Sequence, residues 1–419
     1  MKNIIVVLSL FILPLATEAQ LGGIVNKAKS KINSRIDRKV DKEMEKQLDK
    51  IEYGSPSDSA SKPVSSTTAS GLSSYAKYDF VQGETIIYSN DFATDAMGEL
   101  PIGWNTNGSG AVATIQGLDG KWVQLFQNSA YLTDNKQSFT DNFTVEFDLV
   151  LKRTNPKAAF PLFSFGLLSS RTDDNGSSEF LKVPQKYFST ELKIQPSDYG
   201  GSHIHYHSYS EFNEYLATDI KRTPELEKMF NQKIHIAMQV QKERLRIWMN
   251  ETKIYDLPKA IVAGTDMNQL YFDTKRYGGS ENEVGYLLSN IRIAKGLPDT
   301  RHKLIDEGKF TTSGIFFDVN TATIKPESTG ILKEIADAMK SNEKIRVRIT
   351  GHTDSDGKDA DNLALSQKRA EAIKQALSAD FGINADRMET EGKGETVPVG
   401  DNSTREGKAQ NRRVEFVKM

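Results

Sequence analysis

The sequence contains no cysteine, and its positive and negative charges nearly cancel. Without cysteine there are no disulfide bonds, which excludes the small disulfide-stapled domains found among exported proteins. The 54 Lys and Arg residues against 56 Asp and Glu residues leave no excess charge that would favour a nucleic acid or an acidic membrane surface as a partner. We therefore expect no nucleic-acid partner. The length of 419 residues predicts two or three domains.

Long hydrophobic runs are also absent beyond the first 19 residues. These residues carry one early lysine, an apolar run over 4–15, and small residues at Thr17 and Ala19. The pattern is typical of a secretory signal peptide, because the run is shorter than the roughly 20 residues that span a membrane. A retained membrane anchor is the alternative. Since no cysteine is present to carry a lipid after the signal, membrane attachment would have to come from a partner.

Residues 20–53 are highly charged, with one apolar residue at every fourth position. These are Ile24, Ala28, Ile32, Ile36, Val40, Met44 and Leu48. Steps of four residues advance about 400° around a helix, so the spacing predicts a helix with a slowly winding apolar seam. Such a helix is either a solvated stalk or a surface for homo-oligomerisation or for docking on a partner helix. Residues 54–80 are rich in Ser, Thr and Ala, which predicts a linker.

Residues 81–298 contain many short segments of β-type pattern, separated by Gly, Asn and Asp. The clearest segments are 85–88, 122–125, 143–149, 234–240, 245–249 and 286–293. Many strands with few helical windows predict an antiparallel β-sandwich. The stretches Ser89-Asn90-Asp91-Phe92 and Leu100-Pro101-Ile102-Gly103-Trp104, with the late segments 244–250 and 286–293, resemble concanavalin-like jelly-roll domains.

Three histidines, His203, His205 and His207, alternate along one of these segments and would share one face of a strand. Imidazoles are common ligands of Zn, Cu and Ni. A metal site usually gathers ligands from more than one segment, and His235 is the only further histidine nearby in the sequence. The preferred interpretation is a polar stripe that faces solvent, and we expect no metal.

Glu146 and Asp148 also share a strand face, as paired carboxylates do in some jelly-roll glycosidases. Those families add a third acid two or three residues later, where this sequence has Val150 and Leu151. We therefore predict no catalytic residues and no enzyme. A hydrolase acting through the sandwich is one alternative. A carbohydrate-binding sandwich is another, with sugars stacking on Trp104, Trp122, Tyr206 and Tyr209.

Residues 299–310 are a short charged segment, predicted to be a connector, and residues 311–419 predict a further domain. The apolar residues 315–317 suggest a strand, and Pro326 suits the first turn of a helix that continues to about residue 340. A strand over 345–349, a helix over 362–381 ended by Gly382, and strands over 387–390 and 414–417 follow. The order is βαβαββ, an α/β sandwich with helices on one sheet face.

The last domain carries a dense set of motif residues. They are Phe317-Asp318, Ile324, Pro326, Gly351-His352-Thr353-Asp354, Gly357, Asn362, Leu365-Ser366, Arg369-Ala370, Gly382-Ile383, Arg387, Gly392-Lys393-Gly394-Glu395, Pro398 and Asn411-Arg412-Arg413-Val414-Glu415. In this order they resemble the OmpA-like C-terminal domain, which binds peptidoglycan non-covalently. The resemblance covers about 105 residues, from Gly314 to Met419.

The resemblance implies a ligand, the meso-diaminopimelate of the peptide stem, whose free end carries an ammonium and a carboxylate. By motif position, Asp354 would take the amine and Arg369 the carboxylate. Asn362 and Asp318 would line or order the pocket, and Arg412 would lie at its edge. Charge-assisted hydrogen bonds to both ends of a zwitterion would fix its orientation. The alternative is structural, with Asp354 capping the next helix and paired to Arg369.

Asp356 departs from the family pattern, since relatives usually have a small neutral residue there. It is expected to make the pocket more negative. The acidic loop 354–361 also resembles a calcium loop, but Gly357 and Leu365 stand at the wrong places for an EF-hand. We expect no metal and no cofactor.

The sequence thus predicts a multidomain protein of the cell envelope that binds peptidoglycan without catalysis. Its predicted location is the periplasm, at the cell wall or the outer membrane. An outer-membrane protein or a glycan is the predicted partner of the sandwich. The predicted segments are a signal peptide (1–19), an amphipathic helix (20–53), a linker (54–80), a β-sandwich (81–298), a connector (299–310) and an OmpA-like domain (311–419).

Overall fold

A computed structural model describes residues 78–170, 176–276 and 279–419. The predicted signal peptide and amphipathic helix, and most of the predicted linker, lie outside the described residues. No helix within these described ranges combines the length and apolar character that crossing a membrane would need.

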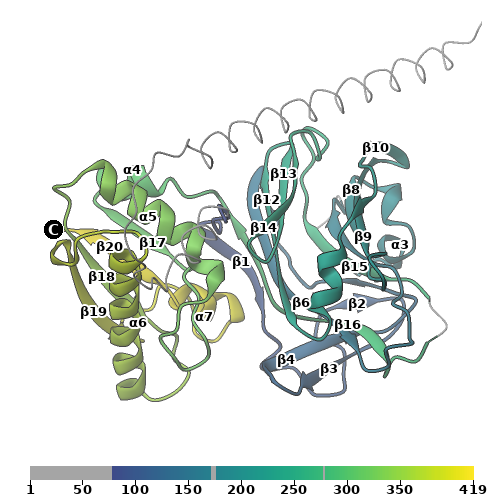
Figure 1. Ribbon diagram of the computed structural model, residues 1–419, viewed down its shortest axis with the longest axis horizontal. Coiled ribbons are helices and arrows are strands. Elements are labelled where there is room, and N and C mark those ends of the chain that lie inside the picture. The colour runs from purple at the N-terminus through teal and green to yellow at the C-terminus, as the bar shows by residue number, and fades with distance from the viewer. Residues whose placement is uncertain (1–77, 171–175, 277–278) are drawn as a thin grey trace, which may run out of the picture. The chain divides into compact units, whose positions relative to one another are not determined.

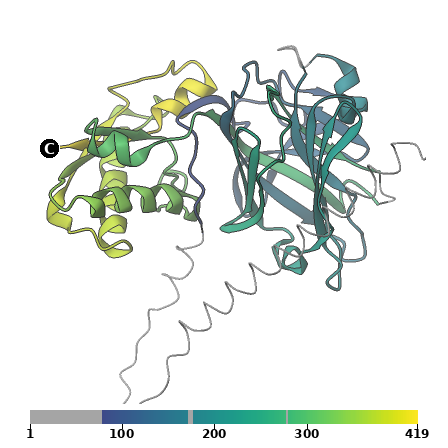
Figure 2. The same cartoon turned by 90° about the horizontal axis from the view of Figure 1, so that it is seen from above.

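The first half of the described chain forms two antiparallel sheets (Figures 1 and 2). One sheet has the order β14-β13-β12-β6-β16-β4-β3, with β1 also paired to β16. Its strands are β1 (Thr85–Asn90), β3 (Gly110–Ile115), β4 (Leu118–Leu125), β6 (Asn142–Arg153), β12 (Lys233–Gln241), β13 (Arg244–Met249), β14 (Thr252–Leu257) and β16 (Val284–Lys295).

The other sheet has the order β10-β9-β8-β7-β15-β5-β2, with β11 also paired to β9. Its strands are β2 (Asn105–Thr106), β5 (Ser129–Leu132), β7 (Phe163–Leu168), β8 (Ser189–Gln195), β9 (His203–Ser210), β10 (Asn213–Ala217), β11 (Lys221–Arg222) and β15 (Gln269–Thr274). A short helix, α3 (Ser178–Lys182), lies between β7 and β8 in the chain. The antiparallel β-rich prediction agrees with this arrangement, whereas the jelly-roll detail stays a prediction.

The two sheets share one apolar core, as the alternation along β6 illustrates. Phe143, Val145 and Phe147 point inward and belong to the core cluster. The ring of Phe147 packs edge-on against Phe165 of β7 at 4.9 Å and against Phe272 of β15 at 5.3 Å, so aromatic contacts join the two sheets.

The second half of the described chain is a four-stranded sheet with helices packed on it (Figure 1). The strand order is β17-β20-β18-β19, in which β18 and β19 are parallel and the other pairs antiparallel. Helices α5 and α6 share one apolar cluster with the sheet. The elements are α4 (Thr300–Ile305), β17 (Lys309–Thr312), α5 (Thr329–Ser341), β18 (Val347–His352), α6 (Asp359–Ala379), β19 (Met388–Gly394), α7 (Arg405–Asn411) and β20 (Val414–Lys418).

This order differs from the predicted βαβαββ in its first strand and in one helix. The sheet begins with β17, which starts at the end of the interval predicted as a connector and continues into the predicted domain, whereas residues 315–317 contribute only a single bridge, from Phe317 to Ile324. In β17 only Phe310 is buried, so its apolar pattern is too weak to read from the sequence. Helix α7 has no apolar stripe, and its N-cap, the Thr404 side chain, accepts a hydrogen bond from Gly407 N.

Two glycines set how closely α6 approaches the sheet. A Cβ atom at Gly351 of β18 would lie 2.4 Å from the carbonyl oxygen of Ser366. One at Gly392 of β19 would lie 2.5 Å from the backbone nitrogen of Gln367. Both obstacles are helix backbone, so only glycine lets the helix rest directly on these strands. This contact places the residues of α6 against the loop that follows β18.

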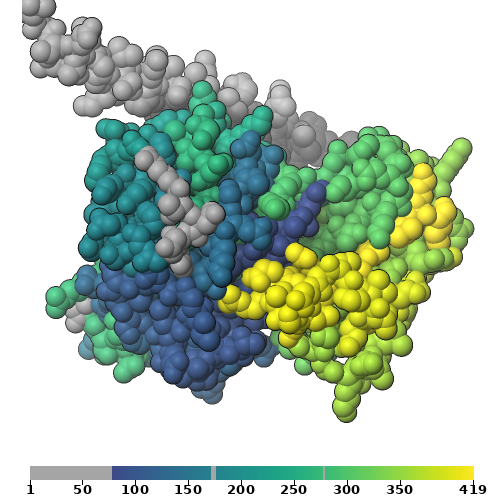
Figure 3. Space-filling model, turned by 180° about the vertical axis from the view of Figure 1, so that it is seen from behind, coloured from purple at the N-terminus to yellow at the C-terminus, as the bar shows by residue number. Residues whose placement is uncertain are grey.

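The sandwich and the C-terminal domain contact each other through charged and polar groups. Lys233 Nζ lies 2.6 Å from Glu327 Oε1, and Arg405 Nη2 lies 2.7 Å from Asp134 Oδ2. Gln410 Nε2 donates to the carbonyl oxygen of Ile86 at 3.0 Å. In the space-filling view the yellow atoms near the C-terminus lie beside the dark blue atoms of the first sandwich residues (Figure 3).

Replacement of Gly392 by alanine is expected to lower the free energy of unfolding by about 1–3 kcal/mol, because α6 must move away from β19. Chemical denaturation followed by circular dichroism measures this loss. Gly285→Ala in β16 is the control, since the nearest atom to its added Cβ is the flexible Gln124 Nε2 at 3.5 Å. An equal loss in both variants would contradict the close-approach argument.

Candidate functional site

One cavity of about 330 Å³ collects most of the residues that the sequence predicted for binding. Asp354, Asn362, Arg369 and Arg412 all line it. Asp318, the fifth predicted residue, is exposed and is not among the lining residues. The sandwich contributes a further wall that the sequence did not reveal, with Asp91, Asp148, Lys233, His235, Asn290 and Arg292.

Asp354 lies in the loop directly after β18 and is only 7% exposed. Its Oδ2 atom is 2.5 Å from Nη1 of Arg412, the C-cap residue directly after α7. Its Oδ1 atom accepts a hydrogen bond from Asp356 N at 3.2 Å. The carboxylate is therefore held in one orientation by its own loop and by an arginine from another element.

Asn362, in the first turn of α6, ties this loop together. Its Nδ2 group donates to the carbonyl oxygens of Asp354 and Asp356 at 3.3 and 3.0 Å, and to Glu395 Oε2 at 2.6 Å. The predicted ordering role of Asn362 is consistent with these bonds. Glu395 is one of the motif residues, but its motif position does not indicate that its carboxylate accepts a hydrogen bond from Asn362.

Arg369, two turns further along α6, does not pair with Asp354. Its Nε atom donates to the carbonyl oxygen of Thr321 at 3.0 Å, and its Cζ atom lies 4.9 Å from the ring centre of Phe317. Burial and the neighbouring Arg412 both lower the pKa of Arg369, whereas Asp354 raises it. Within the described ranges, no carboxylate lies within ion-pair distance of this guanidinium.

The extra acid of the loop, Asp356, lies beside a cation. Lys408 Nζ of α7 is 2.7 Å from Asp356 Oδ1. The predicted gain of negative charge in the pocket is therefore offset by Lys408, which no motif had singled out.

The two acids considered for catalysis, Glu146 and Asp148, are buried on the outer face of β6, with 2% and 3% of their surface exposed. His235 of β12 lies between them, with Nδ1 2.9 Å from Asp148 Oδ1 and Nε2 3.3 Å from Glu146 Oε2. Burial alone would lower the pKa of His235, but the hydrogen bonds and charges of the two acids outweigh it and raise the pKa to about 9. This charged histidine in turn helps to lower the pKa of Asp148 to about 2, against the effect of burial.

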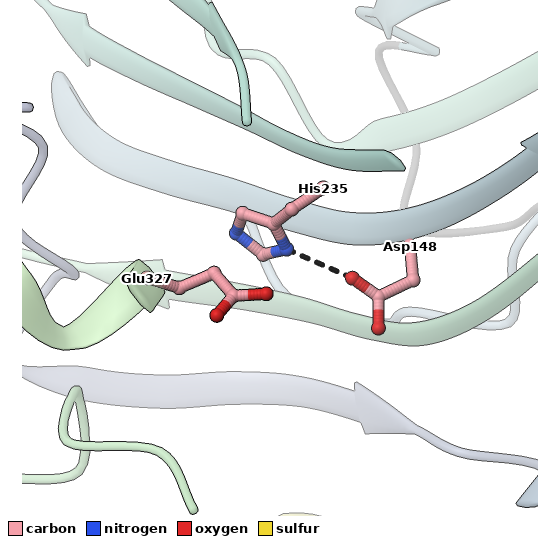
Figure 4. A group of neighbouring side chains, drawn as sticks. All are labelled: Asp148, His235 and Glu327. Carbon is pink, nitrogen blue, oxygen red and sulfur yellow. Dashed lines mark hydrogen bonds and ion pairs between the residues drawn. The ribbon is translucent and has the colours of Figure 1, made fainter. Parts of the chain in front are cut away.

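Glu327 of the C-terminal domain completes this group (Figure 4). Ligand atoms of Asp148, His235 and Glu327 lie within 4.8 Å of one another, a spacing that can suit a metal ion. However, Lys233 Nζ lies 2.6 Å from Glu327 Oε1 and 4.0 Å from Asp148 Oδ2. Protonated His235 contacts both sandwich acids, Glu146 and Asp148. The negative charges are thus offset by protein cations, so the group is best described as an ion-pair network.

The other sandwich residues, which the sequence suggested for metal binding or sugar stacking, have contacts that are typical of structural residues. His203, His205 and His207 share one face of β9, with ring centres 6.2 and 5.0 Å apart along the strand, and His207 Nδ1 lies 3.1 Å from Glu214. Three of the four aromatic residues considered for sugar stacking, Trp104, Trp122 and Tyr206, are buried. Only Tyr209 is partly exposed.

The buried histidine predicts a pH-dependent stability. The ordinary pKa near 6.5 applies to unfolded chains, so the stabilisation by His235 is fully present below pH 6.5 and is lost as the pH rises through about 9. The free energy of unfolding should fall over this range by roughly 3 kcal/mol at most. Asp148 acts in the opposite sense, since its contribution is lost only as the pH falls toward about 2.

Denaturant unfolding of wild type and His235→Gln from pH 6 to pH 9.5 measures this effect. The variant should be less stable at pH 6, because Asp148 and Glu146 lose their cation, and the difference from wild type should shrink as the pH rises. His302→Gln, at an exposed histidine of α4, is the control. A difference between wild type and His235→Gln that stays constant with pH would contradict the charged state of His235.

Comparison with known proteins identifies the C-terminal domain. The OmpA family model matches residues 316–412. The chain is 46% identical over 99 residues to outer membrane porin F of Pseudomonas fluorescens, a match that covers 24% of this chain and 30% of the porin. It is 38% identical over 107 residues to the peptidoglycan-binding protein ArfA of Mycobacterium bovis, covering 26% of this chain and 32% of ArfA. The chain thus spans about a third of the length of these two relatives.

A further relative is covered over most of its length. The outer-membrane lipoprotein YfiB of Pseudomonas aeruginosa is 37% identical over 123 residues, which are 29% of this chain and 73% of YfiB. The matched region contains the loop after β18, helix α6 and helix α7, which build the cavity described above. By its C-terminal domain, the chain belongs to the OmpA family.

Proposed function

We propose that this protein binds peptidoglycan non-covalently, by holding the free end of the diaminopimelate side chain in the cavity between Asp354 and Arg369. The observation that carries the proposal is that these two residues line one cavity, and that Arg369 has no carboxylate partner within the described ranges. Membership of the OmpA family and the similarity to a relative named for peptidoglycan binding support it.

In this proposal the ligand's ammonium lies against Asp354, and its carboxylate lies against Arg369 and Arg412. Asp354 is buried and held by its loop, so it presents a carboxylate in a defined direction. Arg412, which contacts Asp354 in the structure, lines the same cavity as Arg369 and would share the incoming carboxylate with it. Charge-assisted hydrogen bonds at both ends would distinguish a zwitterion from a simple amine.

Asn362 and Asp318 order the site in this proposal and do not bear the ligand's charge. Asn362 holds the carbonyl groups of the Asp354 loop. The carbonyl oxygen of Asp318 accepts a hydrogen bond from Thr321 N at 3.1 Å, and Thr321 in turn holds Arg369. Asp318 therefore acts through the turn that positions Arg369.

The protein is thus assigned to the cell envelope, at the periplasmic cell wall. The sandwich would be the domain that this attachment presents to a partner, an outer-membrane protein or a glycan. Glu146 and Asp148 are buried against His235, so the hydrolase alternative gains no support from them. Homo-oligomerisation through residues 20–53 stays a prediction outside the described residues.

Asp354→Asn and Arg369→Gln are each expected to weaken binding to purified peptidoglycan sacculi roughly 10- to 100-fold, since each removes a charge-assisted bond. Co-sedimentation of the full chain with sacculi measures the affinity. Arg348→Gln is the matched control, because Arg348 is an exposed arginine of β18 whose partner is Glu389 on the surface. Retention of both variants at the wild-type level would contradict the proposed site.

The same assay with two kinds of sacculi tests the proposed ligand. Stems that carry lysine in place of diaminopimelate lack the side-chain carboxylate, so the wild type should bind them more weakly. Arg369→Gln should lose most of this preference, because Arg369 would bind the carboxylate together with Arg412, which is already paired with Asp354. Equal binding of both sacculi by the wild type would contradict recognition of diaminopimelate.

A further inference from the structure

The sandwich places a third arginine, Arg292, in the cavity that holds Arg369 and Arg412. The register of β16 explains how it gets there. Ser289 pairs with Asp148 of β6, but Arg292 pairs with Glu146, so three steps along β16 match two along β6. This bulge contains Asn290 with a positive φ of 51°. Bulges of this kind redirect side chains.

The bulge keeps Arg292 on the outer face of the sheet, with Glu146 and Asp148. The neighbours of Arg292 along the strand, Ile291 and Ile293, belong to the sandwich core. Asn290, the extra residue, donates through Nδ2 to Asp148 Oδ2 at 2.8 Å. The bulge in the backbone of β16 therefore points the side chain of Arg292 toward the C-terminal domain.

The guanidinium of Arg292 lies on an aromatic ring and has no ion-pair partner among the residues that the structure describes. Its Cζ atom is 4.4 Å from the ring centre of Phe316. Arg369 lies in the same way on the next residue, Phe317. The two acids that face Arg292 on the sheet engage His235. Among residues 78–170, 176–276 and 279–419, no carboxylate lies within ion-pair distance of Arg292.

A half-buried cation without a partner is costly, and it gains most from an anion that enters the cavity. Arg292 and Arg412 line the same cavity. Burial lowers the pKa of Arg292, Glu146 partly counters this effect, and the positive charge of Arg412 lowers the pKa further. Only one cavity carboxylate, Asp354, pairs with any of these three arginines in the described chain. The three guanidinium groups therefore keep more N–H donors and more positive charge than one ligand carboxylate needs.

We propose that Arg292 binds a second carboxylate of the same ligand, so that the cavity recognises an acidic stem peptide with a free main-chain carboxylate beside its zwitterionic side chain. This rests on the proposed function. The cavity volume of about 330 Å³ lies at the small end of ligand pockets, which suits the end of such a peptide. The sandwich then takes part in binding through a residue outside the OmpA family match.

The test uses the full chain and two synthetic tripeptides, L-Ala–γ-D-Glu–meso-diaminopimelate with a free C-terminal carboxylate and the same peptide with a C-terminal amide. Calorimetry of the wild type should show about tenfold tighter binding of the acid. In Arg292→Gln this ratio should fall to about one, while binding of the amide stays at the wild-type level. Arg292→Lys should keep part of the preference, and the control Arg348→Gln all of it.

A wild type that does not distinguish the two peptides, or an Arg292→Gln variant that keeps the preference, would overturn this inference and leave sacculus binding through Asp354 and Arg369 intact. Loss of amide binding in Arg292→Gln would also overturn it, since Arg292 would then support the site as a whole. Absence of wild-type binding to both peptides and to sacculi would instead overturn the proposed function. Circular dichroism and the unfolding midpoint of each variant show that the comparison is made between folded proteins.

Discussion

The charge buried on the outer face of β6 is the constraint on which the arrangement of the sandwich and the C-terminal domain depends. Glu146 and Asp148 lie under other elements, where an unpaired carboxylate would cost several kcal/mol. His235 engages both acids, and Lys233 joins the group to Glu327 of the C-terminal domain. Because each charge has a partner, the outer face of this sheet can be covered by another domain.

This covering has a direct consequence for the proposed binding site. The C-terminal domain contributes the loop after β18, α6 and the end of α7 to the cavity, and these supply Asp354, Arg369 and Arg412. In this chain the outer face of the sandwich forms a further wall of the same cavity. The bulge in β16 puts Arg292 on that wall, and consecutive phenylalanines, Phe316 and Phe317, each support one arginine. Residues of two domains therefore share one electrostatic environment.

Much of the C-terminal domain could be predicted from the sequence. Helix α6 and strand β18 follow from their apolar spacing, and the motif residues Asp354, Asn362, Arg369 and Arg412 do come together at one cavity. Strand β17 and helix α7 could not be predicted, because both are short and carry too few buried apolar residues to leave a periodic pattern. In the sandwich, the pattern of residues 143–149 predicts strand β6 and a shared face for Glu146 and Asp148, but only the structure shows that this outer face is buried.

The sequence by itself determined the order of elements with strong periodicity and the identity of the motif residues, since both are carried by local spacing along the chain. Only the tertiary structure decided the pairings. Asp354 lies against Arg412 and not Arg369, Lys408 offsets Asp356, and His235 is charged between two acids. These outcomes depend on distances between residues far apart in the chain and on burial, neither of which is encoded in local spacing. Electrostatic energies vary steeply with both, so the charge states and partners of the site emerge only once the chain is folded.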